Sequence, residues 1–157
     1  MHSFFIRAVG QPHESWQEDA IQRYVQRLKP LAKVEILEAK EGHEGSNKPN
    51  EQRTREREAE KLLYHLPAQA FVVALDEGGK NLDSITLSRN IETWTEGGRP
   101  LVFLIGGSWG LDPSVRERAD IIISFGKQTL PHILARITLL EQLYRTETIL
   151  HHKEYHK

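Results

Sequence analysis

Short apolar runs recur along the chain and alternate with longer segments whose apolar residues follow a helical spacing. The runs at 70–75 and 101–105 are apolar at every position, which is typical of strands buried on both faces of a parallel sheet. Further strands are expected at 4–9, 34–39 and 120–124, and helices at 15–28, 51–66, 84–95, 113–118 and 133–150. This alternation predicts a single-domain α/β protein over residues 1–157, with a mainly parallel sheet and helices on both faces.

Local signals refine several of these elements. Ser15, with Glu18 three positions later, is typical of a capping box at the start of a helix. The polar segment 41–50 contains two glycines and a proline and predicts a mobile loop. The charge-rich segment 51–61 is typical of a solvated helix face, and contact with RNA is the alternative. The last helix is expected to be amphipathic, with an apolar stripe of Ile133, Ile137, Leu140, Leu143 and Tyr144.

Three predicted strands end in segments of small or polar residues. The run 101–105 leads directly into Gly106 and Gly107, and Gly110 follows; the other two segments are 76–79 and 124–131. Ligands of open α/β sheets bind at the carboxyl ends of the strands. We therefore expect these segments to meet at one binding crevice, although any one of them alone is also compatible with a tight turn that binds nothing.

The motifs exclude several ligand classes. The glycine-rich segment has no Lys-Ser/Thr pair, so it is not a P-loop, and it does not match the dinucleotide fingerprint. What remains is a small uncharged or zwitterionic ligand, such as a nucleoside, held largely by backbone groups.

Composition narrows the setting. The chain has no cysteine, which excludes disulfides and thiolate metal sites and fits a cytoplasmic protein. No metal is expected, because the neighbouring His151 and His152 would point apart on a helix. No apolar stretch has the length of a signal peptide core or a membrane span. A net charge of −1 argues against binding of nucleic acid through bulk positive charge, although residues 132–157 are locally basic.

Several motifs together resemble the RlmH family of SPOUT-class methyltransferases. They are Leu75-Asp76, the segment 103–111, Ser124 followed by Thr-Leu-Pro-His at 129–132, Arg-x-x-Leu-x-Glu-Gln-x-Tyr-Arg at 136–145, and Tyr155-His156-Lys157. The resemblance extends over the whole chain. Ser108 departs from it, since many members have proline there, but the flanking glycines are present.

The resemblance implies methyl transfer from S-adenosylmethionine to N3 of a pseudouridine in 23S ribosomal RNA. It also implies a C-terminal trefoil knot that holds the cofactor, and a homodimer in which each subunit completes the other's site. The apolar pattern alone predicts an unknotted sheet, because knots are rare. The cofactor contacts carried over are Leu75, Gly106, Gly107, Gly110, Gly126, Lys127, Gln128, Thr129, Leu130 and Pro131, and the catalytic residues are His132, Arg136, Arg145, Tyr155 and His156.

Removal of the N3 proton needs a base, and His132 and His156 are the candidates. His132 also fits a packing role at a helix start. Arg136 and Arg145 are expected to bind RNA phosphates or a developing oxyanion, or alternatively to pair with Glu141 or Glu147.

The last three residues are expected to act in catalysis rather than in folding, because chain ends are usually disordered; a frayed end without a role is the alternative. The apolar stripe of the last helix agrees with the implied homodimer, and the near-neutral charge favours the assembled ribosome over free RNA as substrate. Two other functions remain open: a non-catalytic RNA- or ribosome-binding protein of the same fold, and a flavodoxin-type ligand-binding protein.

Overall fold

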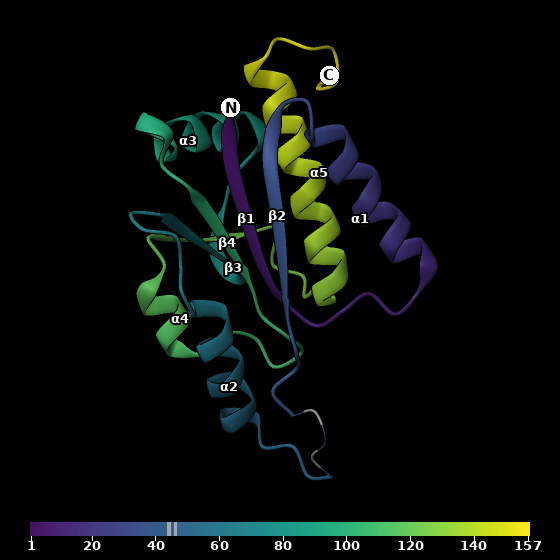
Figure 1. Ribbon diagram of the computed structural model, residues 1–157, viewed down its shortest axis with the longest axis vertical. Helices are drawn as coiled ribbons and strands as arrows, with labels where there is room; N and C mark the ends of the chain where they lie inside the picture. The colour runs from purple at the N-terminus through teal and green to yellow at the C-terminus, as the bar shows by residue number, and fades with distance from the viewer. Residues whose placement is uncertain (44, 46) are drawn as a thin grey trace.

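The computed structural model describes residues 1–43, 45 and 47–157 and contains a five-stranded sheet in the order β2-β1-β4-β3-β5 (Figure 1). All four neighbouring pairs are parallel, which confirms the predicted sheet type. The strands are β1 (His2–Val9), β2 (Ala32–Ala39), β3 (Phe71–Asn81), β4 (Leu101–Ile105) and β5 (Ile121–Ser124).

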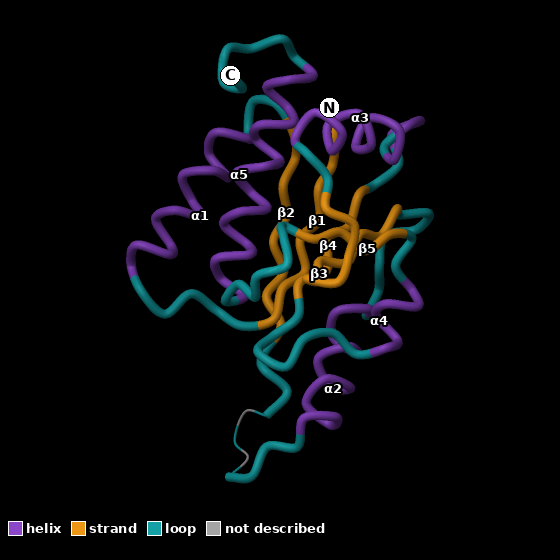
Figure 2. The backbone as a smooth tube through the Cα atoms, turned by 180° about the vertical axis from the view of Figure 1, so that it is seen from behind, coloured by secondary structure: helices purple, strands orange, loops and turns teal. Residues whose placement is uncertain are grey.

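Helices cover both faces of the sheet, as predicted (Figures 1 and 2). One layer holds α1, α3 and α5, and the other holds α2 and α4. Their bounds are α1 (Ser15–Leu28), α2 (Glu51–Leu63), α3 (Ser84–Trp94), α4 (Pro113–Arg118) and α5 (His132–Leu150), with a short 3-10 helix at η1 (Glu96–Gly98).

The core has two parts because successive side chains of a strand point to opposite faces. In β4, Leu101, Phe103 and Ile105 pack toward α1, α3 and α5, whereas Val102 and Leu104 pack toward α2 and α4. All five are almost completely buried. The continuous apolar run of β4 is therefore explained by its place in the centre of a sheet covered on both faces.

The predicted end of β3 at residue 75 is wrong. The strand continues to Asn81, and Leu75 and Lys80 both lie opposite Ile123 of β5. The intervening residues form an irregularity of the bulge type, which inserts extra residues into one strand and bends it. What the sequence presents as a glycine turn is therefore an interruption within a longer strand.

The cap of α1 and the end of α2 differ from the prediction, although the bounds of α1 agree with it. Glu14, not Ser15, precedes the first helical residue of α1, and the side chain of Gln17 accepts hydrogen bonds from the backbone N–H groups of His13 (2.9 Å) and Glu14 (3.2 Å). Helix α2 ends at Leu63 because Tyr64 is extended. Arg7 of β1 holds this chain turn by donating to the carbonyl oxygens of residues 62, 64 and 65.

The predicted stripe of α5 faces the protein's own core. Ile133, Leu140 and Leu143 are buried, and Ile137 and Tyr144 pack against them. The stripe therefore gives no separate support to the homodimer. In the predicted loop 41–50 the described residues form neither helix nor strand, residues 44 and 46 lie outside the described residues, and the mobility of the loop stays a prediction.

Candidate active site

A pocket of about 780 Å³ opens at the carboxyl ends of β4 and β5 and at the interruption within β3. Its walls come from the three segments that the sequence singled out, which confirms that they meet. They are residues 75–77, 105–111 and the segment from Phe125 to His132, with Ile123 and Ala135 beside them.

Nine of the ten predicted cofactor residues line this pocket. They are Leu75, Gly106, Gly107, Gly110, Gly126, Gln128, Thr129, Leu130 and Pro131. Lys127 is exposed and is not part of the lining, so its predicted contact is not supported by the geometry. Sequence reasoning missed Asp76, Glu77 and Phe125, although all three lie within or beside the motifs it used.

Gly107 is required by the protein behind the pocket. A β-carbon at this position would lie 2.8 Å from Oε2 of Glu58 and 3.0 Å from Cγ1 of Val9, which is closer than real contacts allow. Glu58 of α2 is itself buried, and its Oε1 accepts a hydrogen bond from the N–H of Gly42 (3.3 Å). Burial raises the pKa of the Glu58 carboxyl, against the opposing effect of that backbone hydrogen bond.

Glu58 is a residue that the sequence analysis assigned to a solvated helix face. The signal that reveals it is the spacing of its buried neighbours, Thr54, Ala59 and Leu62, which lie on one side of α2. Only this side of the charge-rich helix faces the core.

Two carboxylates at the pocket differ in their charge balance. Asp76 receives two hydrogen bonds from Arg116, at 3.0 and 2.9 Å. Burial alone would raise the pKa of Asp76. The Arg116 guanidinium and the N–H of Gly78 together lower this pKa by more than burial raises it, so the net shift is downward. Glu77 accepts a hydrogen bond from the Thr129 hydroxyl and, within the described part of the chain, has no cationic partner. The uncompensated charge of Glu77 favours a ligand with a positive group.

His132 lies at the pocket edge, at the first residue of α5. Its Nε2 is buried against Gly10, where a β-carbon would lie only 2.5 Å from that nitrogen. No hydrogen-bond partner of Nε2 is found in the described residues. Burial lowers the pKa of His132, so the imidazole is neutral at pH 7.

The geometry of this chain does not support the predicted catalytic contact of Arg136. Its side chain is fully buried, donates to the carbonyl oxygen of Gly10 (3.0 Å) and pairs with Glu38 (3.3 Å). It pairs with neither Glu141 nor Glu147. A guanidinium in this position holds the start of α5 against the ends of β1 and β2, and RNA cannot reach it.

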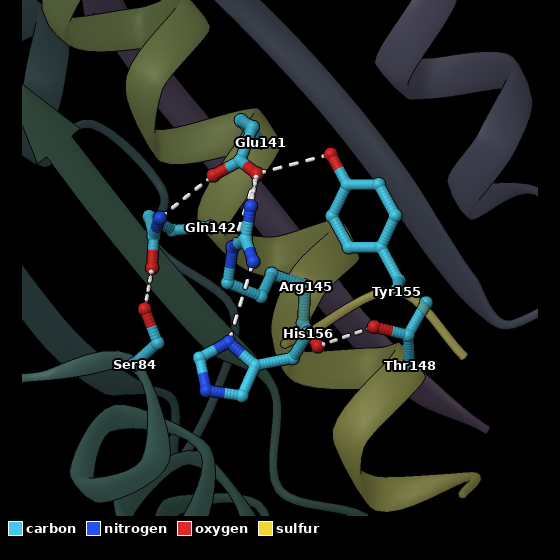
Figure 3. Close-up of polar contacts among 7 residues, drawn as sticks. All are labelled: Ser84, Glu141, Gln142, Arg145, Thr148, Tyr155 and His156. Carbon is cyan, nitrogen blue, oxygen red and sulfur yellow. Dashed lines mark hydrogen bonds and ion pairs between the residues drawn. The ribbon is translucent and has the colours of Figure 1, made fainter. Parts of the chain in front are cut away.

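The C-terminal tail is held on α5 and is not a free end (Figure 3). The Tyr155 hydroxyl donates to Glu141 (3.1 Å), and the Tyr155 ring packs edge-on against Tyr144 at 4.8 Å between centroids. Burial and the Glu141 carboxylate raise the pKa of Tyr155 to about 12. Arg145 pairs with Glu141 at 2.6 Å, which agrees with the ion-pair alternative predicted for this residue. Its Nη1 also lies 3.3 Å from Nδ1 of His156.

The tail follows the carboxyl end of α5 (Figure 1), whereas the pocket is lined by His132 and Ala135 at the start of this helix. His132 and Arg145 are thirteen positions apart on this helix, which corresponds to about 20 Å at 1.5 Å per residue. None of Arg145, Tyr155 and His156 lines the pocket. The structure thus brings His132 to the predicted cofactor site and leaves the other candidate catalytic residues of the same chain away from it.

The described residues contain no cluster of three or more histidine, aspartate or glutamate side chains that could hold a metal ion. Among the same residues, no helix combines the length and apolar character of a membrane span.

Comparison with known proteins agrees with this geometry. A family model described as a predicted SPOUT methyltransferase matches residues 3–156. The chain is 41% identical over 152 residues to the ribosomal RNA large subunit methyltransferase H of Acidiphilium cryptum, covering 97% of this chain and 92% of that protein. It is 42% identical to the protein of this name from Gemmatimonas aurantiaca, over 97% of each chain, and 44% identical to that of Bifidobacterium animalis, over 97% and 98%.

The family match covers nearly the whole chain, and it agrees with the glycine-lined pocket at the strand ends. S-adenosylmethionine is the methyl donor of these enzymes. The chain belongs to the SPOUT methyltransferase family.

Proposed function

We propose that this protein methylates N3 of a pseudouridine in 23S ribosomal RNA, on the assembled ribosome. The observation that carries the proposal is the pocket at the ends of β4 and β5 and the interruption within β3, built from the residues that the family motifs identify. The relatives with the same overall length are named as methyltransferases of large-subunit ribosomal RNA.

The pocket fits S-adenosylmethionine. Its volume of about 780 Å³ lies within the usual range of small-molecule sites. Apolar walls from Leu75, Ile105 and Phe125 suit an adenine ring, and the glycine segments offer backbone groups for its polar edges. The Glu77 carboxylate suits a molecule with a sulfonium and an ammonium group. When bound, the cofactor supplies a methyl group activated by the positive sulfur.

The proposed knot lies in the segment between β5 and α5. This segment carries the chain from the sheet to the α1, α3 and α5 layer and lines the pocket together with the segments after β3 and β4. A chain threaded at this point would hold the cofactor between its loops.

We infer that the active site is shared between two subunits of a homodimer. Within one chain, the tail and the pocket are separated along α5 by about 20 Å. A second copy is therefore needed to bring Arg145, Tyr155 and His156 to a pocket. Trp109, Leu130 and Leu134 are large apolar residues exposed at or near the pocket, and their burial would stabilise such a pair of subunits.

His156 of the partner subunit is the proposed base for the N3 proton. Tyr155 stays protonated at neutral pH, because its pKa is about 12. His132 has one ring nitrogen buried against Gly10. His156 is exposed and lies beside Arg145, whose charge would stabilise the oxygen that gains negative charge as the proton leaves.

The test is incubation with labelled S-adenosylmethionine and three substrates: undermethylated 70S ribosomes, isolated large subunits and protein-free 23S RNA. The proposal expects label on N3 of one pseudouridine, strongest in the 70S particles, located by mass spectrometry of RNA fragments. Cofactor binding without transfer to any substrate would instead make the chain a non-catalytic member of the family. Label on another atom would overturn the assignment of N3.

A further inference from the structure

We propose that Arg27 of α1 is an RNA phosphate-binding residue beside the C-terminal tail. The proposal deepens the function above and rests on it for the identity of the RNA. Arg27 belongs to α1, which packs beside α5 in the same layer (Figure 1).

The Arg27 guanidinium is held by two aromatic rings. Its Cζ lies 5.8 Å from the ring centre of Tyr24 and 5.6 Å from that of Tyr144. Both distances are within the range of cation–π attraction, about 6 Å. Such a contact fixes the plane of the guanidinium but leaves the N–H groups along its edge available to an acceptor.

The charge of Arg27 is not balanced within the protein. In the described part of the chain it has neither an ion pair nor a hydrogen bond, and it contacts the two rings. Arg145, in contrast, is paired with Glu141 through two hydrogen bonds of 3.1 and 2.6 Å. A fixed, partly buried and unpaired guanidinium is prepared to bind an anion, and phosphate matches its fork of donors.

Arg27 is one ring away from the tail. Tyr144, which Arg27 contacts, packs against Tyr155, and Arg145 lies over the other ring of this pair at 4.7 Å. An RNA base bound at His156 would therefore place a neighbouring stretch of its backbone along this row of tyrosines. Arg27 contacts this row through the rings of Tyr24 and Tyr144.

The surrounding charge supports a polyanion as the ligand. Residues 20–34 contain four cations, Arg23, Arg27, Lys29 and Lys33, and no acidic residue, although the whole chain has a net charge of −1. The tail adds Lys153 and Lys157. This local excess of positive charge suits the phosphate backbone of the RNA that carries the target base.

The experiment measures binding of wild-type protein and variants to large ribosomal subunits and to protein-free 23S RNA over a series of KCl concentrations. Arg27→Gln removes the charge, Arg27→Lys keeps it without the flat fork, and Arg118→Gln is the matched control on the exposed surface of α4, in the opposite layer. We expect Arg27→Gln to weaken binding about 10-fold and to reduce the slope of log K against log salt by about 0.7 to 0.9. Arg27→Lys should keep the slope and lose less affinity, and Arg118→Gln should behave as wild type.

A purely structural role for Arg27 predicts a different result. Arg27→Gln would then lower the melting temperature and leave the salt slope unchanged, and that outcome would overturn the proposal. A reduced slope on subunits but not on protein-free RNA would assign the anion to an acidic ribosomal protein, which also overturns it. Because these measurements need no methyl transfer, an inactive wild-type protein would refute the proposed function without deciding the role of Arg27.

Discussion

The two ends of α5 both hold a histidine and an arginine, but in opposite surroundings. At the start of the helix, His132 is packed against Gly10, and Arg136 is fully buried and bound to Glu38 and Gly10. At the other end, Arg145 and His156 lie at the surface, held by Glu141 and by the ring of Tyr155.

This difference separates two tasks. Side chains at the first end are buried and fix the position of the pocket, because Arg136 is bound to Gly10 and Glu38 and Nε2 of His132 is closed off by Gly10. Side chains at the second end keep solvent-accessible donors and an imidazole, which a substrate can reach. The same residue types therefore serve the architecture at one end and, in the proposed function, the RNA at the other.

The largest expected effect comes from removing the tail beyond the carboxyl end of α5. Deletion of residues 155–157 should reduce methyl transfer by roughly two to four orders of magnitude, as expected for loss of acid–base help, and leave cofactor affinity unchanged. It should also lower the free energy of unfolding by about 1 to 2 kcal/mol, because the Tyr155 contacts are lost. Kinetics, calorimetry and urea unfolding measure these effects. A deletion that abolishes cofactor binding would show that the two ends are not separate.

A subunit-mixing experiment tests whether the two ends of α5 act together across a dimer. A tail-deleted subunit and a subunit with Thr129→Trp, which places an indole at the pocket, should each be inactive alone. Equal mixing should restore roughly a quarter of wild-type activity, because half of the dimers combine both variants and each of these has one intact shared site. No recovery after demonstrated subunit exchange would mean that the site is formed within one chain.

The pocket beside the start of α5 can be tested at Gly107, which lies in its wall. Gly107→Val should remove cofactor binding, because it places a branched side chain where the ligand approaches the backbone. The structure predicts a loss of stability of about 1 to 3 kcal/mol in addition, because the new side chain meets Glu58 and Val9. Urea unfolding measures this loss. Combination with Glu58→Ala should recover part of it, and strictly additive effects would show that the two positions do not touch.

The smallest expected effect concerns the protonation of His132. Its folded pKa is below the ordinary value of 6.5, so in the interval between the two values the unfolded chain binds more protons. The free energy of unfolding should therefore rise with pH through this interval and fall as the solution is acidified. His132→Gln should flatten this part of the curve, as followed by chemical denaturation at several pH values. A curve that keeps its slope in the variant would assign the titration to another group.

Most of the fold was predictable because its signals are local. Continuous apolar runs mark β3 and β4, and helical spacing marks α5. The pocket was predictable because small or polar residues follow directly after the apolar runs 70–75 and 101–105. The continuation of β3 beyond Leu75 was not, since it depends on pairing with Ile123 of β5 rather than on the residues at 76–79.

The charged residues of the interior were the main failure. Arg136 was assigned to RNA phosphates or a developing oxyanion, or to an ion pair with Glu141 or Glu147, whereas its actual partner Glu38 is distant in the sequence and gives no local signal. Glu58 lies in the most charged helix of the chain and is buried only because Thr54 and Leu62 share its side. Docking of Tyr155 on Glu141 likewise depends on how the chain turns back after α5.

The order of the strands also sets when the protein can fold during its synthesis. Strand β1 lies between β2 and β4, so its second neighbour begins only at Leu101. The layer of Phe4, Ile6 and Phe103 is not covered until α5, from His132 onward, has left the ribosome. A nascent chain therefore exposes a large apolar sheet face until the last part is made, and its folding competes with aggregation over that interval.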